Sequence, residues 1–245
     1  MNLYQIPSRT ALVTGASMGL GLALTRRLVE DGWHVVADAR DGERLIAAVA
    51  SLPPGSVTVV PGDVSEPGHR AQLAAAAIDR GDLALLVNNA SVLAGSPQPR
   101  LADLRPEALT HVFAVNTVAP LDLVRRCLPH LRSNGGAVVN LSSDAAVEAY
   151  EEWGAYAASK AALDHASAVL AAEEPDLDVY AVDPGDMATD LHQQAFPGED
   201  ISDRPSPETV VSALLQLLAT RPPSGRYRAG DLLAATRAPV SAEVQ

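Results

Sequence analysis

The chain has 245 residues, of which 47% are hydrophobic, and this is enough apolar material for one large core. Its formal net charge of −12 disfavours nucleic acid and anionic membranes as partners, because both bind through basic patches. No apolar run is long enough to span a bilayer, residues 1–9 lack a signal segment, and a single cysteine, Cys127, excludes an intrachain disulfide. We therefore expect a soluble, cytoplasmic protein.

Strand-like and helix-like segments alternate along the chain, as they do in doubly wound α/β folds. The expected strands are 10–14, 34–39, 57–60, 83–88, 137–141, 178–182 and a short one near Tyr227. The expected helices are 20–31, 41–51, 67–80, 106–132, 153–173 and 207–220. This order predicts a single Rossmann-type α/β domain over residues 1–245, with a parallel sheet of about seven strands flanked by helices.

The first strand leads into a glycine turn that is followed at once by a helix. Glycines let the backbone approach a pyrophosphate, and a helix N-terminus offers free N–H groups and the positive end of a dipole. A tight turn alone would also use glycine, but the strand-turn-helix context favours dinucleotide binding. The turn residues expected to bind the cofactor are Gly15, Ser17, Met18, Gly19, Leu20 and Gly21.

Lys160 is the only lysine of the chain, and it stands four residues after Tyr156. Every other strongly basic residue is arginine, so this position indicates a need for a compact ammonium group. Positions i and i+4 share one face of a helix, and a nearby positive charge lowers the pKa of a phenol. The pair is therefore a candidate proton donor, although two residues on a solvated helix face would give the same pattern.

Seven sequence blocks follow one another in an order and at spacings that resemble the short-chain dehydrogenase/reductase family. They are 14–21, Asp63-Val64, Asn88-Asn89-Ala90, Asn116, Ser142-Ser143, Tyr156 with Lys160, and Pro184-Gly185 followed by Thr189. The resemblance covers nearly the whole chain. It implies an oxidoreductase that transfers a hydride between a nicotinamide cofactor and a small carbonyl compound or secondary alcohol, without a metal.

The resemblance also implies roles for a catalytic set of four residues, Asn116, Ser143, Tyr156 and Lys160. Ser143, thirteen residues before Tyr156, would hold the substrate oxygen, and Tyr156 would donate the proton. Lys160 would bind the nicotinamide ribose and keep the phenol acidic, while Asn116 would bind a water linked to Lys160. The remaining cofactor contacts implied are Asp63, Val64, Asn89, Ala90, Pro184, Gly185 and Thr189.

Cofactor choice is predicted from the end of the second strand. Eighteen residues after Gly21 stands Ala39, where NAD-using relatives carry an acid for the ribose hydroxyls. Arg40 follows, placed for a charged contact with a 2′-phosphate, so NADP(H) is favoured. An alignment shifted by one residue would instead make Asp38 the NAD-type acid, and NAD(H) stays possible. An exposed turn would also explain Arg40.

The substrate side departs from the family pattern. Ser91 replaces a usual glycine after Ala90, and the usual glycine after Ser143 is missing. The polar segment 186–207 resembles a substrate-covering lid, although a frayed insertion would look similar. Four acids follow the serine block, which suits either a polar or cationic substrate or a solvated surface; they are Asp144, Glu148, Glu151 and Glu152.

Two alternative functions stay open beside an NADP(H)-dependent ketone or aldehyde reductase. One is an NAD-dependent alcohol dehydrogenase. The other is a non-catalytic dinucleotide-binding redox sensor, although such proteins typically lose the tyrosine or lysine that this chain keeps. Small and apolar residues on the helices 106–132 and 153–173 predict a homodimer or homotetramer.

Overall fold

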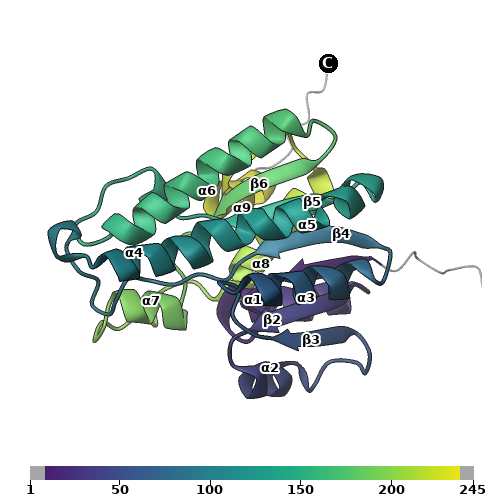
Figure 1. Cartoon of the computed structure of the whole chain (residues 1–245), viewed down its shortest axis with the longest axis horizontal. Coiled ribbons are helices and arrows are strands. Elements are labelled where there is room, and N and C mark those ends of the chain that lie inside the picture. The colour runs from purple at the N-terminus through teal and green to yellow at the C-terminus, as the bar shows by residue number, and fades with distance from the viewer. Residues whose placement is uncertain (1–8, 238–245) are drawn as a thin grey trace, which may run out of the picture.

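The centre of the structure is a sheet of seven parallel strands in the order β3-β2-β1-β4-β5-β6-β7 (Figure 1). The computed structural model describes residues 9–237. The prediction that residues 1–9 contain no signal segment therefore falls, except for Arg9, outside the described residues. The strands are β1 (Thr10–Val13), β2 (His34–Ala39), β3 (Val57–Pro61), β4 (Leu83–Asn88), β5 (Ala137–Leu141), β6 (Asp178–Asp183) and β7 (Gly225–Arg228). The predicted doubly wound Rossmann sheet is confirmed.

The middle strands form because they are short apolar runs that can be covered on both faces. All residues of β1, β2, β4 and β5 are buried, as expected for a parallel sheet between two helical layers. β1 pairs with both β2 and β4, so the chain winds outward in opposite directions from this pair. In such sheets the ligand site lies at the carboxyl ends of the strands where the winding reverses.

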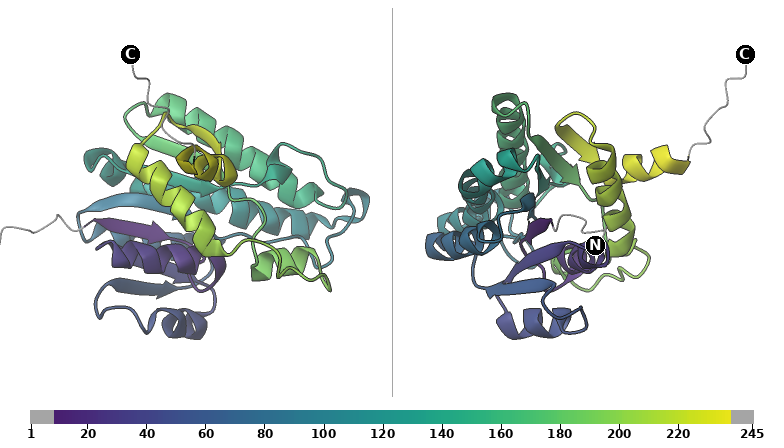
Figure 2. Two further views of the ribbon diagram at one scale, coloured as in Figure 1. Left: turned by 180° about the vertical axis from the view of Figure 1, so that it is seen from behind. Right: turned by 90° about the vertical axis from the view of Figure 1, so that its right-hand side faces the viewer.

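Helices cover both faces of the sheet (Figure 2). Clusters of buried side chains place α1, α8 and α9 on one face and α3 and α5 on the other, where α6 lies alongside. The helices are α1 (Gly19–Glu30), α2 (Gly42–Val49), α3 (Pro67–Ile78), α4 (Pro106–Phe113), α5 (Ala119–Ser133), α6 (Gly154–Glu173), α7 (Asp190–Ala195), α8 (Pro207–Thr220) and α9 (Ala229–Arg237). None of the helices within residues 9–237 is long and apolar enough to cross a membrane.

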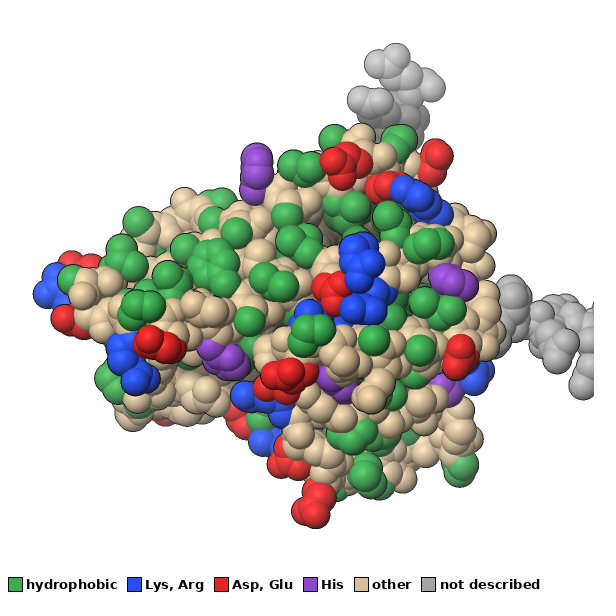
Figure 3. All heavy atoms as spheres, in the orientation of Figure 1, with side chains coloured by type: hydrophobic (Ala, Val, Ile, Leu, Met, Phe, Trp, Pro, Cys, Tyr) green, Lys and Arg blue, Asp and Glu red, His purple; other side chains and the backbone are tan. Residues whose placement is uncertain are grey.

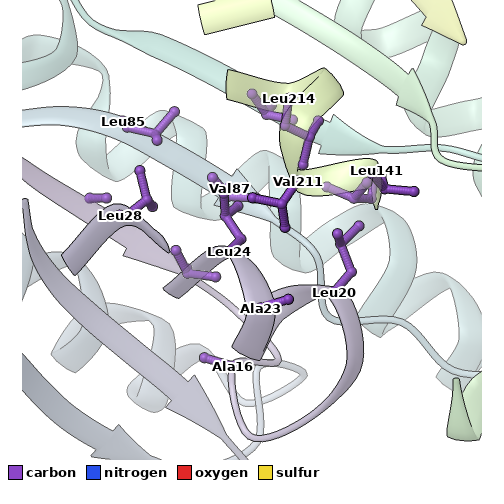
Figure 4. Close-up of a cluster of buried hydrophobic side chains, with 14 of the residues drawn as sticks. Ala16, Leu20, Ala23, Leu24, Leu28, Leu85, Val87, Leu141, Val211 and Leu214 are labelled. Carbon is purple, nitrogen blue, oxygen red and sulfur yellow. The ribbon is translucent and has the colours of Figure 1, made fainter. Parts of the chain in front are cut away.

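The cluster under α1 and α8 holds the glycine turn in place (Figure 4). Leu20 and Leu24 of α1 are buried against this face of the sheet, together with Val211 and Leu214 of α8. Burying a leucine or valine side chain stabilises a fold by about 1.5–3 kcal/mol relative to leaving it exposed. This packing fixes the N-terminus of α1 at the carboxyl end of β1, where a dinucleotide would meet it.

Three features of the structure differ from the sequence prediction. The helix expected over 106–132 consists of α4 and α5 joined by a π-helical segment, η2 (Ala114–Val118). A short helix, α7, forms inside the segment expected as a lid loop, with Thr189 as its N-cap through a hydrogen bond from His192 N. α9 was not predicted at all, because its apolar residues follow β7 without a turn signal.

Candidate active site

A cleft of about 590 Å³ opens at the carboxyl ends of β1 and β4, where the winding reverses. The glycine turn forms its floor, and two glycines are required there. Gly15 has a φ of +67°, which other residues rarely adopt. A Cβ on Gly21 would lie 2.3 Å from the carbonyl oxygen of Gly15, so only glycine allows this close approach. The cradle fits the pyrophosphate of a dinucleotide.

Most of the predicted cofactor residues line this cleft. They are Gly15, Ser17, Met18, Gly19, Leu20, Arg40, Asp63, Val64, Asn89, Ala90 and Thr189. Gly21 supports the turn from behind instead. Pro184, Gly185 and Tyr156 line a smaller cavity next to the cleft, and Thr189 belongs to both. The fold therefore brings most of the predicted cofactor residues together from six separate segments of the chain, whereas Lys160 lines neither cavity.

Asn89 connects the end of β4 to the glycine turn. Its Nδ2 donates hydrogen bonds to the carbonyl oxygens of Thr14 at 2.8 Å and Gly15 at 3.1 Å. The Thr14 hydroxyl in turn accepts from the backbone amides of Asn89 and Ala90, each at 3.0 Å. These hydrogen bonds connect the two walls of the cleft, the end of β4 and the glycine turn. Polar groups of each wall find their hydrogen-bond partners in the other wall.

The wall of the cleft at the end of β2 contains the residues on which the predicted cofactor choice depends. Asp38 is buried, and its Oδ1 lies 2.7 Å from Nε2 of His69, also buried. Ala39 offers no polar side chain, whereas Arg40 and Arg44 both line the cleft. Asp41 caps α2 by accepting a hydrogen bond from the amide of Arg44. Asp63 accepts from the amide of Ser65, and Glu66, three residues further on, is the N-cap of α3.

Tyr156 lies in the first turns of α6, with its side chain only 7% exposed. Burial raises the pKa of its phenol to about 12, and the neighbouring hydroxyl side chains of Ser91 and Ser143 oppose this shift. The net shift of the Tyr156 pKa is therefore upward, whereas the sequence predicts a lowered pKa beside Lys160. Removal from water and the negative charges of Asp144 and Asp183 outweigh the hydrogen bonds.

Lys160 is also buried, with 2% of its surface exposed. Its Nζ donates a hydrogen bond to the carbonyl oxygen of Leu141 at 2.7 Å and lies 5.6 Å from the centre of the Tyr156 ring. Burial lowers the pKa of this ammonium to about 8, and the negative charge of Asp164, one helical turn further on, opposes that shift. The expectation that Tyr156 and Lys160 share one helix face agrees with this geometry.

Asn116 lies in the π-helical segment η2, where α4 passes into α5. Its Oδ1 accepts a hydrogen bond from the amide of Val92 at 2.9 Å. Its Nδ2 donates to the Val92 carbonyl and the Ser159 hydroxyl, both at 3.0 Å. A π-helical turn often marks a functional position. Here it places the side chain of Asn116 between the segment that follows β4 and helix α6. The water expected between Asn116 and Lys160 stays a prediction.

Ser143 follows the end of β5 by two residues, and its hydroxyl lies next to Tyr156. Its Oγ donates a hydrogen bond to Oδ1 of Asp144 at 2.9 Å. The sequence analysis noted Ser91 as a replacement for a usual glycine and gave its hydroxyl no role, although that hydroxyl lies beside Tyr156 and also contacts Asn116. A polar residue in a position where relatives carry glycine was the available signal. The three hydroxyls of Ser91, Ser143 and Tyr156 thus come together at the edge of the cleft.

A network around Arg226 supports this cluster from behind. Arg226, in β7, donates from Nη2 to the carbonyl oxygen of Ser143 at 2.8 Å and from Nε to Oδ2 of Asp164 at 2.9 Å. Its Nη2 also lies 3.5 Å from the buried carboxylate of Asp183. Sequence reasoning missed Arg226, because nothing in the sequence near β7 indicates a contact with β5 and α6. Asp164 had a signal, namely its i+4 spacing from Lys160.

Part of the segment expected as a lid lines the cleft. Thr189 and Leu191 line both the cleft and the smaller cavity. Asp190 forms an ion pair with Arg44 of α2 at 3.1 Å, which connects the two sides of the cleft. No group of three or more metal-ligating side chains occurs in the part of the chain that the structure describes. A dinucleotide-binding Rossmann protein is the class that this fold and cleft define.

Comparisons with known proteins agree. Residues 9–200 match the family model of short chain dehydrogenases. An uncharacterized oxidoreductase of Schizosaccharomyces pombe is 34% identical, over 77% of this chain and 75% of its own length. An NADPH-dependent aldehyde reductase-like protein of Arabidopsis thaliana is 31% identical, with 76% of this chain and 75% of that protein covered. A Shigella flexneri short chain dehydrogenase, solved with NADP, is 27% identical with a TM-score of 0.83, covering 91% of this chain and 97% of that one.

The chain belongs to the short-chain dehydrogenase/reductase family. It is therefore an oxidoreductase acting on CH–OH or C=O groups, and the family binds a nicotinamide dinucleotide.

Proposed function

We propose that this enzyme reduces small ketones or aldehydes with NADP(H), and that Tyr156 donates the proton. The single observation that carries the proposal is the convergence of the Ser143 and Tyr156 hydroxyls on a cavity beside the dinucleotide cleft. A substrate oxygen placed between them would meet two hydroxyl donors. A bound nicotinamide supplies the hydride, which leaves the proton to the protein.

The protonation state of Tyr156 supports the reductive direction. Because burial raises its pKa to about 12, the phenol carries its proton at neutral pH and can give it to a developing alkoxide. The resulting phenolate would lie near the ammonium of Lys160, which stabilises it. Lys160 would also reach the nicotinamide ribose, and Asn116 would hold α6 and the segment after β4 in register through Ser159 and Val92.

The preference for NADP(H) is supported by the wall at the end of β2. Two arginines, Arg40 and Arg44, line the cleft there, and a guanidinium pairs well with a phosphate. The carboxylate of Asp38 already has a hydrogen-bond partner, Nε2 of His69 at 2.7 Å, so it does not require the ribose hydroxyls as donors. An NAD-dependent alcohol dehydrogenase is the second candidate, because Asp38 also lines the cleft.

We also propose a homodimer or homotetramer in the cytoplasm. The face in Figure 3 carries hydrophobic side chains over α4 and α6, with few charges between them. Exposed large apolar residues of α4, η2 and α6 include Leu109, Val118 and Val169. A second copy would cover this surface. Sedimentation at micromolar concentration tests the proposal, and a monomeric mass would contradict it.

The experiment that tests the reductase is a titration of purified protein with NADPH and NADH, followed by a screen of ketones, aldehydes and alcohols with both cofactors. We expect tighter binding of NADPH and turnover of ketones or aldehydes. Binding without any turnover would indicate a redox sensor, and turnover of alcohols with NAD⁺ alone would indicate the second candidate.

A further inference from the structure

The smaller cavity, of about 100 Å³, lies directly over the hydroxyls of Ser143 and Tyr156. Its charged lining is acidic: three carboxylates contribute, namely Asp144, Asp183 and Asp186, and no lysine or arginine of the described chain does. A carbonyl compound that enters the cavity would therefore meet negative charge beside its reacting oxygen. The small volume means that only the part of a substrate nearest the carbonyl is enclosed.

Only one of the three carboxylates lacks a positive partner. Asp183 lies 3.5 Å from Arg226 and 3.6 Å from Arg228. Asp186 lies 3.8 Å from Arg204. Asp144, the residue directly after Ser143, forms no ion pair within residues 9–237. The uncompensated charge of the cavity is therefore located next to the proposed substrate-binding hydroxyl.

Asp144 accepts hydrogen bonds from the Ala145 amide, at 2.8 Å, and from two hydroxyl groups that each have only one proton. Ser143 Oγ donates its one proton to Asp144 Oδ1 at 2.9 Å, so it cannot donate to a substrate oxygen at the same time. Tyr150 likewise has one hydroxyl proton, yet its oxygen lies 3.0 Å from Asp144 and 2.8 Å from Glu148. An ammonium group brings three donors. If it took over Asp144, the Ser143 proton would become free for the substrate oxygen.

Two further side chains of the cavity suit such a substrate. His192 is nine-tenths buried, with 10% of its side chain exposed, and its Nε2 has no hydrogen-bond partner among the described residues. A buried polar atom without a partner is costly, and a polar ligand in the cavity would remove that cost. The ring of Trp153 lies near those of Tyr156 and Phe196, with distances between ring centres of 5.5 Å and 5.8 Å. The faces of aromatic rings attract cations.

We propose that the cavity binds a substrate with a protonated amine next to its carbonyl or hydroxyl group, an amino ketone or amino alcohol, and that Asp144 pairs with the amine. This inference rests on the proposed reductase function. The adjacency of Asp144 and Ser143 sets the distance between the two substrate groups, because one side chain takes the nitrogen and the other the oxygen. A carboxylate at the same place would be repelled.

Three ketones of similar size test the proposal: aminoacetone, hydroxyacetone and pyruvate carry a positive, neutral and negative group. With NADPH at pH 7, we expect kcat/KM to be at least tenfold higher for aminoacetone than for hydroxyacetone, and lowest for pyruvate. Asp144→Asn should reduce the aminoacetone-to-hydroxyacetone ratio roughly ten- to hundredfold, the effect of losing a charge-assisted bond. Asp176→Asn, the same change at an exposed turn, should leave the ratio unaltered.

Equal kcat/KM for aminoacetone and hydroxyacetone in the wild type would overturn the proposal whatever the variants do, and so would an unchanged ratio in a folded Asp144→Asn protein. If no ketone is turned over, the reductase function fails instead. The amine site is then judged by calorimetry, with 1-amino-2-propanol and 1,2-propanediol as ligands of the NADPH-saturated protein. Selective binding of the amine, lost in Asp144→Asn, supports the site, and equal binding of both ligands contradicts it.

Discussion

The guanidinium of Arg226 donates a hydrogen bond to the main-chain carbonyl of Ser143 at 2.8 Å, across 83 positions of sequence. The same side chain pairs with Asp164, whose charge supports the protonated form of Lys160. Arg226 is thus a positioning residue: it reaches the backbone behind one proposed catalytic group and the electrostatic partner of another, without lining the cavity itself.

Arg226→Gln should lower kcat by roughly tenfold, because losing a hydrogen bond from a charged group costs about 1.5–3 kcal/mol, part of which falls on the geometry of Ser143. Arg226→Lys should recover only part of this loss, because an ammonium cannot reproduce the fork that contacts Ser143 and Asp164 together. Steady-state kinetics and thermal melting separate the two effects. Normal kcat in Arg226→Gln would show that the network is merely structural.

The pH dependence of reduction should follow Lys160. Its pKa is lowered from 10.5 to about 8 by burial, so the ammonium is lost as the pH rises through about 8, and kcat/KM should fall there. Asp164→Asn removes a charge that favours the ammonium, so the fall should move to lower pH. Arg226→Gln leaves Asp164 without its cation and should move it to higher pH. Shifts in the same direction for both variants would contradict this assignment.

Lys160→Arg is the companion to that measurement. It keeps the positive charge but replaces a compact ammonium by a planar guanidinium, which does not fit the buried space beside Leu141. We expect most activity to be lost and the fall in kcat/KM near pH 8 to disappear, since arginine does not deprotonate in this range. Near-normal kinetics would mean that only the charge matters.

Tyr156→Phe should leave NADPH binding nearly intact and reduce kcat on the order of 10² to 10⁴, the usual effect of losing a general acid. The change removes only the hydroxyl, whose neighbours are the side chains of Ser91 and Ser143. Fluorescence titration of NADPH and single-turnover kinetics measure the two quantities. Wild-type kcat in the variant on any substrate would rule out Tyr156 as the proton donor.

Arg40→Ala should weaken NADPH binding tenfold or more and NADH binding little, because only NADPH carries the 2′-phosphate and a charge-assisted pair is worth about 1.5–3 kcal/mol. Adding Ala39→Asp should then favour NADH by offering an acceptor to the ribose hydroxyls. Binding titrations with both cofactors check this.

A preference for NADH would be recognised by a different result. If the wild type prefers NADH and Asp38→Ala abolishes its binding, Asp38 is the ribose acceptor. That variant also leaves His69 buried without its 2.7 Å partner, so its melting temperature must be measured beside its affinity. A loss of affinity in a fully folded protein is the result that favours the NAD-dependent enzyme.

The sequence by itself determined those parts of the protein that depend on neighbours along the chain. Alternating apolar runs predict β1 to β6 within one or two residues, because burial on both sides of a parallel strand leaves a local pattern. The glycine turn and the i, i+4 spacing of Tyr156 and Lys160 are equally local. Their placement together at the end of the sheet follows once the winding order is known.

Only the tertiary structure decided the properties that sum over distant segments. The pKa of Tyr156 rises rather than falls because burial by several elements outweighs the hydrogen bonds of Ser91 and Ser143, and no spacing encodes burial. The π-helical turn at Asn116 depends on bonds to Val92 and Ser159, and Asp38 is engaged because α3 brings His69 against β2. Such contacts join residues that are far apart in the sequence, so no local sequence pattern predicts them.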